Sequence, residues 1–276
     1  MRREKRARLI RFVVATVFVV LISIPLYFAI IAGMMELSEI ARRPPYLFPP
    51  NPTLTYYRQI APLMTRPLLN SFLIGICIAC ITVCLAPLVG YGLAKLRLRE
   101  EVKGAVLGLI FLLQLLPGVS MVTPLFLVFY KLGLINNLWS VIVAIAAGQV
   151  PFVSLILATY MASGIPNELI ESAYIDGASS LRAFRSIVLP LARPALATAW
   201  LLSFMAGWGD LLLSMCFVQN KSLYPASVAM MAYTTSYGTQ WNLLMAAATL
   251  YALPPVFVAL VAGRQLASGL LSGAIK

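Results

Sequence analysis

The chain has 276 residues, of which 61% are hydrophobic and only 11% are charged. Soluble domains are about half apolar and about a quarter charged, so this composition excludes an ordinary soluble domain and indicates a membrane protein. The formal net charge is +12, but no soluble domain with a basic face accompanies it, so we expect no nucleic-acid partner.

Six apolar runs are long enough to cross a bilayer, which needs about 20 residues per helix. The first run is too long for a signal peptide and contains Pro25 in its interior, so we interpret it as a retained span. The sequence therefore predicts an all-α, polytopic membrane protein with six transmembrane helices. In chain order the runs lie at about residues 9–33, 68–94, 104–130, 138–161, 195–218 and 241–262.

Basic residues are distributed unequally between the segments that join these runs. Lys and Arg are retained on the cytoplasmic side of a membrane. Most of the 21 basic residues lie in four alternate segments, at residues 1–11, 95–103, 182–193 and 264–276. This bias predicts a multi-pass protein of the cytoplasmic (inner) membrane with both termini in the cytoplasm, and it places the polar stretch between the fourth and fifth runs on the same side.

Several chemistries are excluded or disfavoured by the residue types present. The chain has no histidine, which removes His-dependent triads, His metal ligands and His proton relays. Cys77 and Cys80 form a C-x-x-C spacing, but without a second pair we interpret them as apolar packing rather than a metal or redox site. No Gly-rich phosphate loop of the G-x-x-x-x-G-K-[ST] type occurs, so any ATP hydrolysis would belong to another subunit. We expect no catalytic residue, no metal and no cofactor bound by this chain.

Few polar side chains lie inside the predicted spans. Asp210 is the carboxylate well inside one of them, and no basic residue is near it in the same span, which disfavours a proton relay. Asn70, Gln114 and Gln149 are the other polar residues. Their side chains either form hydrogen bonds between helices or contact a translocated solute.

A polar stretch at residues 162–194 separates the fourth and fifth runs. Gly164 suits a helix C-terminus, and Pro166 suits the first turn of a new helix. The pair Asp176-Gly177 allows a tight turn, because glycine takes positive φ at little cost. Beyond it, an apolar face at helical spacing predicts a second short helix, and Pro190 and Pro194 bracket a break. The face consists of Leu181, Phe184, Ile187 and Val188.

The product would be a cytoplasmic helix-turn-helix. It is either a plain connector or a docking element, and its length favours docking.

The residues from 171 to 194, ESAYIDGASSLRAFRSIVLPLARP, resemble the E-A-A-x-x-D-G-A signature of the permease subunits of ABC importers. Ser172 departs from the signature, which usually has alanine there. Other stretches resemble the maltose-type carbohydrate permeases: LAKLR at 93–97, LGLIN at 132–136 and the tail GLLSGAIK at 269–276. The W-N-D common in the fifth span is W-G-D here, at 208–210.

The resemblance implies a type I ABC permease fold as a single transmembrane domain over residues 1–276, with its core at about 68–265 and a coupling loop at 162–194. It implies four kinds of neighbour: a second permease subunit, two copies of an ATPase subunit that binds ATP and Mg, an extracytoplasmic substrate-binding protein, and membrane lipid. The cargo implied is a carbohydrate or carbohydrate derivative, moved by alternating access. The alternatives are a glycerophospho-compound, an amino sugar or a peptide as cargo, or a secondary carrier.

The resemblance also implies three groups of functional residues. The coupling residues would be Glu171, Ser172, Ala173, Asp176, Gly177, Ala178 and Phe184. The residues along the substrate pathway would be Gln114, Gln149, Trp208 and Asp210. Two outer loops, at about 34–67 and 219–240, would meet the binding protein, the second through Tyr224, Tyr233 and Tyr237. The alternative is that these side chains serve only the packing of the loops.

Overall fold

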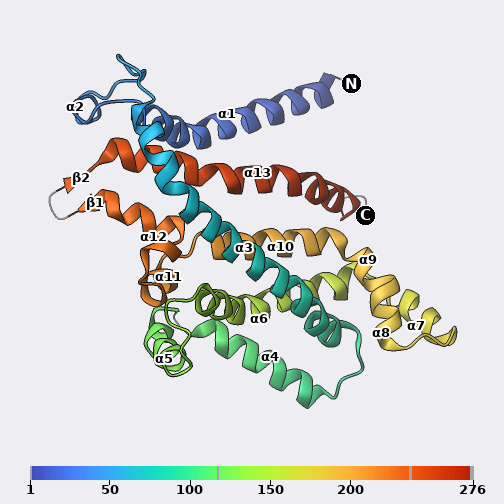
Figure 1. The fold of residues 1–276 in the computed structure, drawn as a ribbon. Helices are drawn as coiled ribbons and strands as arrows, with labels where there is room; N and C mark the ends of the chain where they lie inside the picture. Colours follow the sequence, from blue (N-terminus) through green and yellow to red (C-terminus); the bar gives the residue numbers. More distant parts are fainter. Residues whose placement is uncertain (1, 117, 236–237, 274–276) are drawn as a thin grey trace. The chain divides into compact units, whose positions relative to one another are not determined.

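The computed structural model (Figure 1) describes residues 2–116, 118–235 and 238–273. The chain divides into two compact units. Unit 1 comprises Met1–Thr65 and Met230–Leu253, and unit 2 comprises Arg66–Ala229 and Pro254–Lys276. Within the described residues, four helices are long and apolar enough to cross a membrane, and two bent helix pairs raise the number to as many as six. The prediction of an all-α polytopic protein is confirmed.

Unit 1 gathers the start of the chain with the first part of the last helix. Its helices are α1 (Arg2–Ala32), α2 (Leu37–Ile40) and the beginnings of α3 and α13. The hydroxyl of Tyr57 on α3 lies within hydrogen-bonding distance of two other helices, 3.0 Å from the Ile30 carbonyl oxygen on α1 and 3.2 Å from Thr249 Oγ1 on α13. The Tyr57 hydroxyl group therefore links α1, α3 and α13.

Unit 1 also contains a small hairpin, which follows the 3₁₀ turn η3 (Met231–Tyr233). Strands β1 (Thr234–Thr235) and β2 (Gly238–Thr239) pair antiparallel. The described residues of the predicted outer loop at about 219–240 therefore include regular structure.

Four of the predicted spans are single helices, and one of these four is longer than expected. The first and sixth spans correspond to Leu9–Ala32 of α1 and Trp241–Val261 of α13 (Trp241–Gly273), and the fourth to α6 (Leu138–Gly164). The second belongs to α3 (Thr55–Lys95), whose 41 residues are about twice what one span needs. Residues 55–67 were predicted as outer loop because Arg58, Arg66 and two prolines interrupt the apolar run, but they are helical.

The third predicted span is wrong as a continuous helix. It consists of α4 (Glu100–Leu115) and α5 (Gly118–Lys131), whose axes differ by 97°. Leu116 has extended geometry, with φ −71° and ψ 120°. A residue that precedes proline avoids the helical region, and Pro117 follows Leu116 in the sequence.

The fifth predicted span is also interrupted. Helix α10 (Arg193–Trp208) stops at Gly209, and α11 (Leu212–Phe217) resumes three residues later. Composition alone did not indicate this break, because residues 195–218 are almost uniformly apolar.

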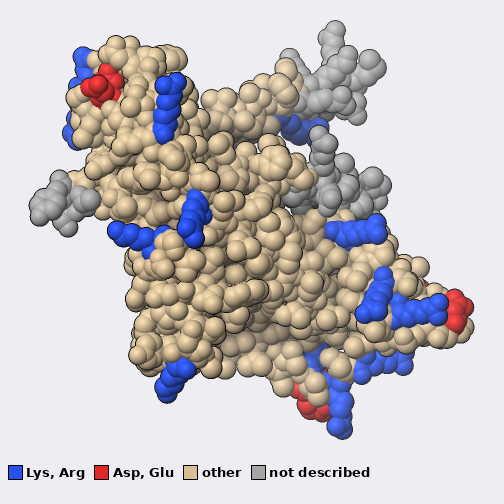
Figure 2. Space-filling model, viewed as in Figure 1, with Lys and Arg blue, Asp and Glu red and all other residues tan. Residues whose placement is uncertain are grey.

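The core of unit 2 includes α3, α6 and α10, and α3 and α10 approach each other closely at two glycines. A Cβ on Gly75 would lie 2.8 Å from Phe204 Cδ2, and one on Gly207 would lie 3.1 Å from Gly75 Cα. Small residues allow helix backbones to approach closely in membranes, where no hydrophobic force drives helices together. On the face shown in Figure 2, a broad area carries no Lys, Arg, Asp or Glu side chain, as a lipid-facing surface requires.

Candidate functional site: the coupling loop

The polar stretch begins as a helix directly after α6. Ile165 and Pro166 are extended, with ψ 115° and 138°, and α7 (Asn167–Ile175) starts after them. Pro166 is therefore the residue before the helix and not, as predicted, in its first turn. Glu168 places negative charge at the positive end of the helix dipole, and Ile170 is buried against unit 2.

The predicted turn at Asp176-Gly177 is present. Gly177 has φ +80°, its N–H donates to the Tyr174 carbonyl oxygen at 3.0 Å, and the Ala178 N–H donates to the Ala173 carbonyl oxygen at 2.9 Å. These two bonds form a Schellman motif, which satisfies carbonyl groups that the helix end would leave open. Four residues then separate the end of α7 from the next helix.

The second arm is a composite helix. Ser179 caps α8 (Ser180–Ala183) through the Arg182 N–H, and a π-helical turn (η1, Phe184–Val188) and α9 (Leu189–Leu191) continue it. The break falls at Ala192, between the two prolines as predicted, and the axis turns by 78° into α10.

The apolar face of this arm differs from the prediction at one position. Phe184 and Val188 are buried and Ile187 is half-buried, but Leu181 is 51% exposed and Ala183 is buried instead. The composite helix does not keep a strict α-helical spacing from 181 to 188, since five of its residues form the π-helical turn.

The surface of the loop carries the residues that a partner would meet. Glu171, Ser172, Asp176 and Gly177 are exposed, and so is Ile175, whose side chain is 87% exposed at the end of α7. Ala173 and Ala178 are half-buried, and Phe184 packs inward. Of the predicted coupling residues, Phe184 thus supports the loop from within, while the others lie at or near its surface.

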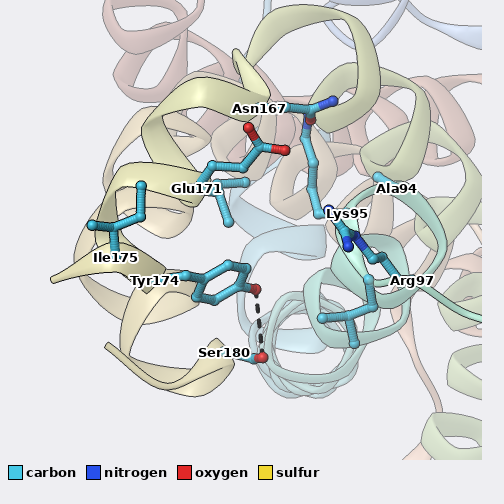
Figure 3. A pocket seen from close by; sticks show the side chains of 10 residues that line it. Ala94, Lys95, Arg97, Asn167, Glu171, Tyr174, Ile175 and Ser180 are labelled. Carbon is cyan, nitrogen blue, oxygen red and sulfur yellow. Dashed lines mark hydrogen bonds between the residues drawn. The ribbon is translucent and has the colours of Figure 1, made fainter. Parts of the chain in front are cut away.

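A hollow of about 580 Å³ lies between α7 and the end of α3 (Figure 3). Ala94 and Lys95 line it from α3, Arg97 lines it from the segment after α3, and Asn167, Glu171 and Tyr174 line it from α7. Figure 3 shows the Tyr174 hydroxyl bonded to Ser180 across the loop, at 3.4 Å. The hollow is thus rimmed by basic, acidic and aromatic side chains.

The four residues predicted along a substrate pathway lie in different surroundings. Gln114 on α4 donates to the Gly148 carbonyl oxygen on α6 at 3.1 Å, which brings it beside Gln149. Trp208 is 2% exposed and stacks on Phe204. Asp210 accepts hydrogen bonds from the Leu213 and Ser214 N–H groups at 3.4 and 2.8 Å. Its carboxylate therefore caps α11 in the break after α10, and substrate contact by these residues stays a prediction.

Sequence reasoning named Asn70 as a polar span residue that forms hydrogen bonds or contacts a solute, and it assigned no role to Ser71 or Asn136. Asn136 has φ +60°, and its Oδ1 accepts from the Gln219 and Asn220 N–H groups at 2.6 and 3.0 Å. Asn70 Nδ2 donates to the carbonyl oxygens of Ser222 and Tyr224, and Ser71 Oγ accepts from the Ala226 N–H. These three side chains hold the segment from 219 to 226 in one conformation.

The three tyrosines predicted to meet a binding protein are in different places. Tyr224 follows the 3₁₀ turn η2 (Lys221–Leu223), and Tyr233 ends η3, where burial raises the pKa of its hydroxyl. Tyr237 lies outside the described residues.

An Asn-Asn pair before a helix, as at 136–137, is a sequence signal for a left-handed residue, because Asn adopts positive φ more readily than other non-glycine residues.

We expect Asn136→Gly to release the segment that carries Lys221. Glycine keeps the positive φ but removes the side-chain acceptor, so about 1–3 kcal/mol of local stability is lost at the two N–H groups. Trypsin should then cleave the nanodisc-embedded protein faster after Lys221, which mass spectrometry of the fragments identifies. Asn136→Asp keeps the acceptor and serves as the control. Equal cleavage rates in all three proteins would contradict the assignment.

The fold defines a multi-pass membrane protein with a helical polar loop between α6 and α10, and comparison with known proteins specifies its class. The family described as binding-protein-dependent transport system inner membrane component matches residues 86–271. The chain belongs to this family, the permease subunits of ABC importers.

Similar proteins extend the match over nearly the whole chain. The sulfoquinovosyl glycerol transport system permease protein SmoH of Agrobacterium fabrum is 28% identical over 97% of this chain and 93% of its own length. The trehalose transport system permease protein SugB of Mycobacterium tuberculosis is 32% identical, over 83% and 84%. The trehalose/maltose transport system permease protein MalG of Thermococcus litoralis is 29% identical, over 100% and 99%.

A solved structure supports the fold independently. The crystal structure of a bacterial ABC transporter involved in the import of the acidic polysaccharide alginate matches with a TM-score of 0.73. It covers 96% of this chain and 98% of its own, at 19% sequence identity, so the likeness is one of fold. The predicted ABC permease fold is confirmed.

Proposed function

We propose that this chain is one permease subunit of an ATP-driven importer for a carbohydrate or carbohydrate derivative. The observation that carries the mechanism is the α7 turn: a short helix ended by a Schellman motif at Gly177 and exposed along Glu171, Ser172 and Asp176. The cargo class rests on relatives named for trehalose, maltose and sulfoquinovosyl glycerol. A glycerophospho-compound, an amino sugar or a peptide is the alternative cargo.

The complete importer would contain a second permease subunit, two ATPase subunits that bind ATP and Mg, and an extracytoplasmic binding protein. The chain itself would hydrolyse nothing. Both termini would lie in the cytoplasm, as the excess of Lys and Arg in the segments on that side favours. Residues 1–276 would act as one transmembrane domain, with residues 162–194 docked on an ATPase subunit.

In this arrangement ATP binding brings the ATPase subunits together and displaces α7. The membrane-spanning helices then change between inward-facing and outward-facing states. The acids Glu171 and Asp176 would contact the ATPase, and the glycine turn would keep the element compact. Such a mechanism needs differential stability of the two states rather than reaction chemistry in this chain.

Uptake in cells tests the cargo. Cells that lack this chain, but retain the genes beside it, should lose ATP-dependent uptake of at least one of radiolabelled trehalose, maltose and sulfoquinovosyl glycerol. Proline uptake through an unrelated carrier serves as the control. Unchanged sugar uptake together with loss of glycerol 3-phosphate or peptide uptake would replace the carbohydrate proposal by the alternative.

We expect Ile175→Asp to weaken the attachment of the ATPase subunit. Burying an isoleucine against a partner contributes about 1.5–3 kcal/mol, so a charged side chain at this 87% exposed position should cost about tenfold or more in affinity. Co-purification of the ATPase with the tagged permease in detergent measures the effect. Ile175→Leu is the control, and equal recovery with both variants would exclude Ile175 from the interface.

A further inference from the structure

Without further contacts, the link between α6 and the coupling loop would be free to bend. Helix α6 ends at Gly164, α7 begins at Asn167, and the two residues between them are extended. Backbone dihedrals are the soft degrees of freedom of a chain, and only the φ of Pro166 is fixed by its ring. A displacement of α7 would bend the chain at residues 165 and 166 and would not reach the membrane-spanning helices, unless another side chain bridges the link.

Lys95, the last residue of α3, bridges it. Its Nζ lies 2.6 Å from the Ile165 carbonyl oxygen and 2.6 Å from Asn167 Oδ1. One ammonium group therefore bonds residues on both sides of Pro166. Bonds from a charged donor are shorter and stronger than neutral ones, and the positive charge also suits the C-terminal end of α6.

Tyr91 makes the second bridge, one turn earlier on α3. It is 5% exposed, and its hydroxyl lies 3.1 Å from the Tyr174 hydroxyl and donates to the Ser180 carbonyl oxygen at 3.3 Å. Its ring packs on Phe184 with 5.1 Å between centroids. Tyr91 thus contacts α7, α8 and the π-helical turn, so it holds both arms of the loop.

Residues four apart share one face of a helix, so Tyr91 and Lys95 act side by side. We propose that they form a clasp, a pair of side chains that fixes the coupling loop to α3. Movement of the ATPase subunit would then be transmitted to the membrane-spanning helices through α3. Tyr91 and Lys95 are positioning residues, since they act through α7 and touch neither nucleotide nor cargo. The inference rests on the proposed coupling role of the loop.

The experiment separates transmission from mere support of the fold. The full importer is purified with Tyr91→Phe and Lys95→Met combined, in a chain whose four cysteines are replaced by alanine. Spin labels are placed at Leu88 on α3 and Leu169 on α7, which are 48% and 43% exposed. Distances between the labels are measured without nucleotide and with ATP and vanadate, and ATP hydrolysis and transport are measured in liposomes.

With the clasp intact, the distance between the labels should stay the same in both nucleotide states, because α3 and α7 move together. In the double variant it should broaden and change on ATP binding. Transport per ATP hydrolysed should fall about tenfold, which is within the range of ordinary coupling energies, while ATPase subunits remain attached. Lys95→Arg, used in place of Lys95→Met, should restore the amount of transport per ATP hydrolysed, since a guanidinium also donates to two acceptors.

Two controls and a second variant keep the result interpretable. Arg99→Met removes a neighbouring exposed cation, and Tyr160→Phe removes a hydroxyl from α6; both should leave the distance and the ratio unchanged. Asn167→Leu breaks the Lys95 bridge from an exposed position, so it tests the clasp should the α3 variant fail to fold.

An unchanged distance and ratio in the double variant, or in Asn167→Leu where that variant stands in for it, would overturn the clasp. Failure of the proposed function would look different: the unaltered importer would transport none of the sugars, while the label distances would still report whether α3 follows α7.

Discussion

Gly177→Pro should abolish ATP-driven uptake while the permease remains in the membrane. Gly177 has φ +80°, which the proline ring cannot adopt, and its N–H donates one of the two bonds of the Schellman motif. Both the conformation and the donor are lost, at about 3 kcal/mol or more. Uptake of labelled sugar, with the amount of permease in the membrane measured by immunoblot, gives the result.

The control for this substitution is Gly177→Asn. No atom lies within 4 Å of a Cβ built on Gly177, so a side chain meets no steric obstacle there, and Asn tolerates the left-handed region. We expect Asn to retain most uptake and Val, which resists positive φ, to lose much of it. Equal uptake by the Pro and Asn variants would show that the turn geometry is not needed for coupling.

The sequence predicted the coupling loop better than the spans. Gly164, Gly177 and the prolines at 190 and 194 impose local backbone constraints that neighbours barely alter, and the structure agrees with them. The predicted span boundaries depend on average hydropathy, and this average does not detect a helix break inside an apolar run. For this reason the interruption at residues 209–211 was missed.

The partners of the clasp were beyond sequence reasoning for a different reason. Sequence reasoning counts Lys95 among the cytoplasmic basic residues and within the LAKLR stretch, and it places Tyr91 inside the second run without assigning it a role. Their bonds reach Ile165, Asn167 and Ser180, 70 to 89 positions further along the chain. Such contacts follow from how α3 packs against the loop, which hydropathy and local turn chemistry do not specify. Asp210 likewise was predicted in a span, and its capping role appears only once the break after α10 is known.

Gly75→Val should destabilise unit 2 more than any substitution at an open glycine of the same helix. The added Cβ would lie 2.8 Å from Phe204 Cδ2 and 3.2 Å from the Phe204 carbonyl oxygen. The Phe204 ring cannot retreat, because it is fully buried and stacked between Trp200 and Trp208 at 5.5 and 5.7 Å. The helices α3 and α10 must therefore separate, and overpacking of this kind costs about 1–3 kcal/mol or more.

The measurement is thermal unfolding of the purified permease in detergent, followed by tryptophan fluorescence. We expect the apparent Tm of Gly75→Val to fall by about 5 °C or more. Gly92→Val, on the same helix, adds the same side chain where no atom lies within 4 Å, so its Tm should change little. Should both variants unfold at the same temperature, the crossing of Gly75 and Gly207 would not be the contact that holds α3 against α10. The clasp at Tyr91 and Lys95 would then lie on a helix anchored elsewhere.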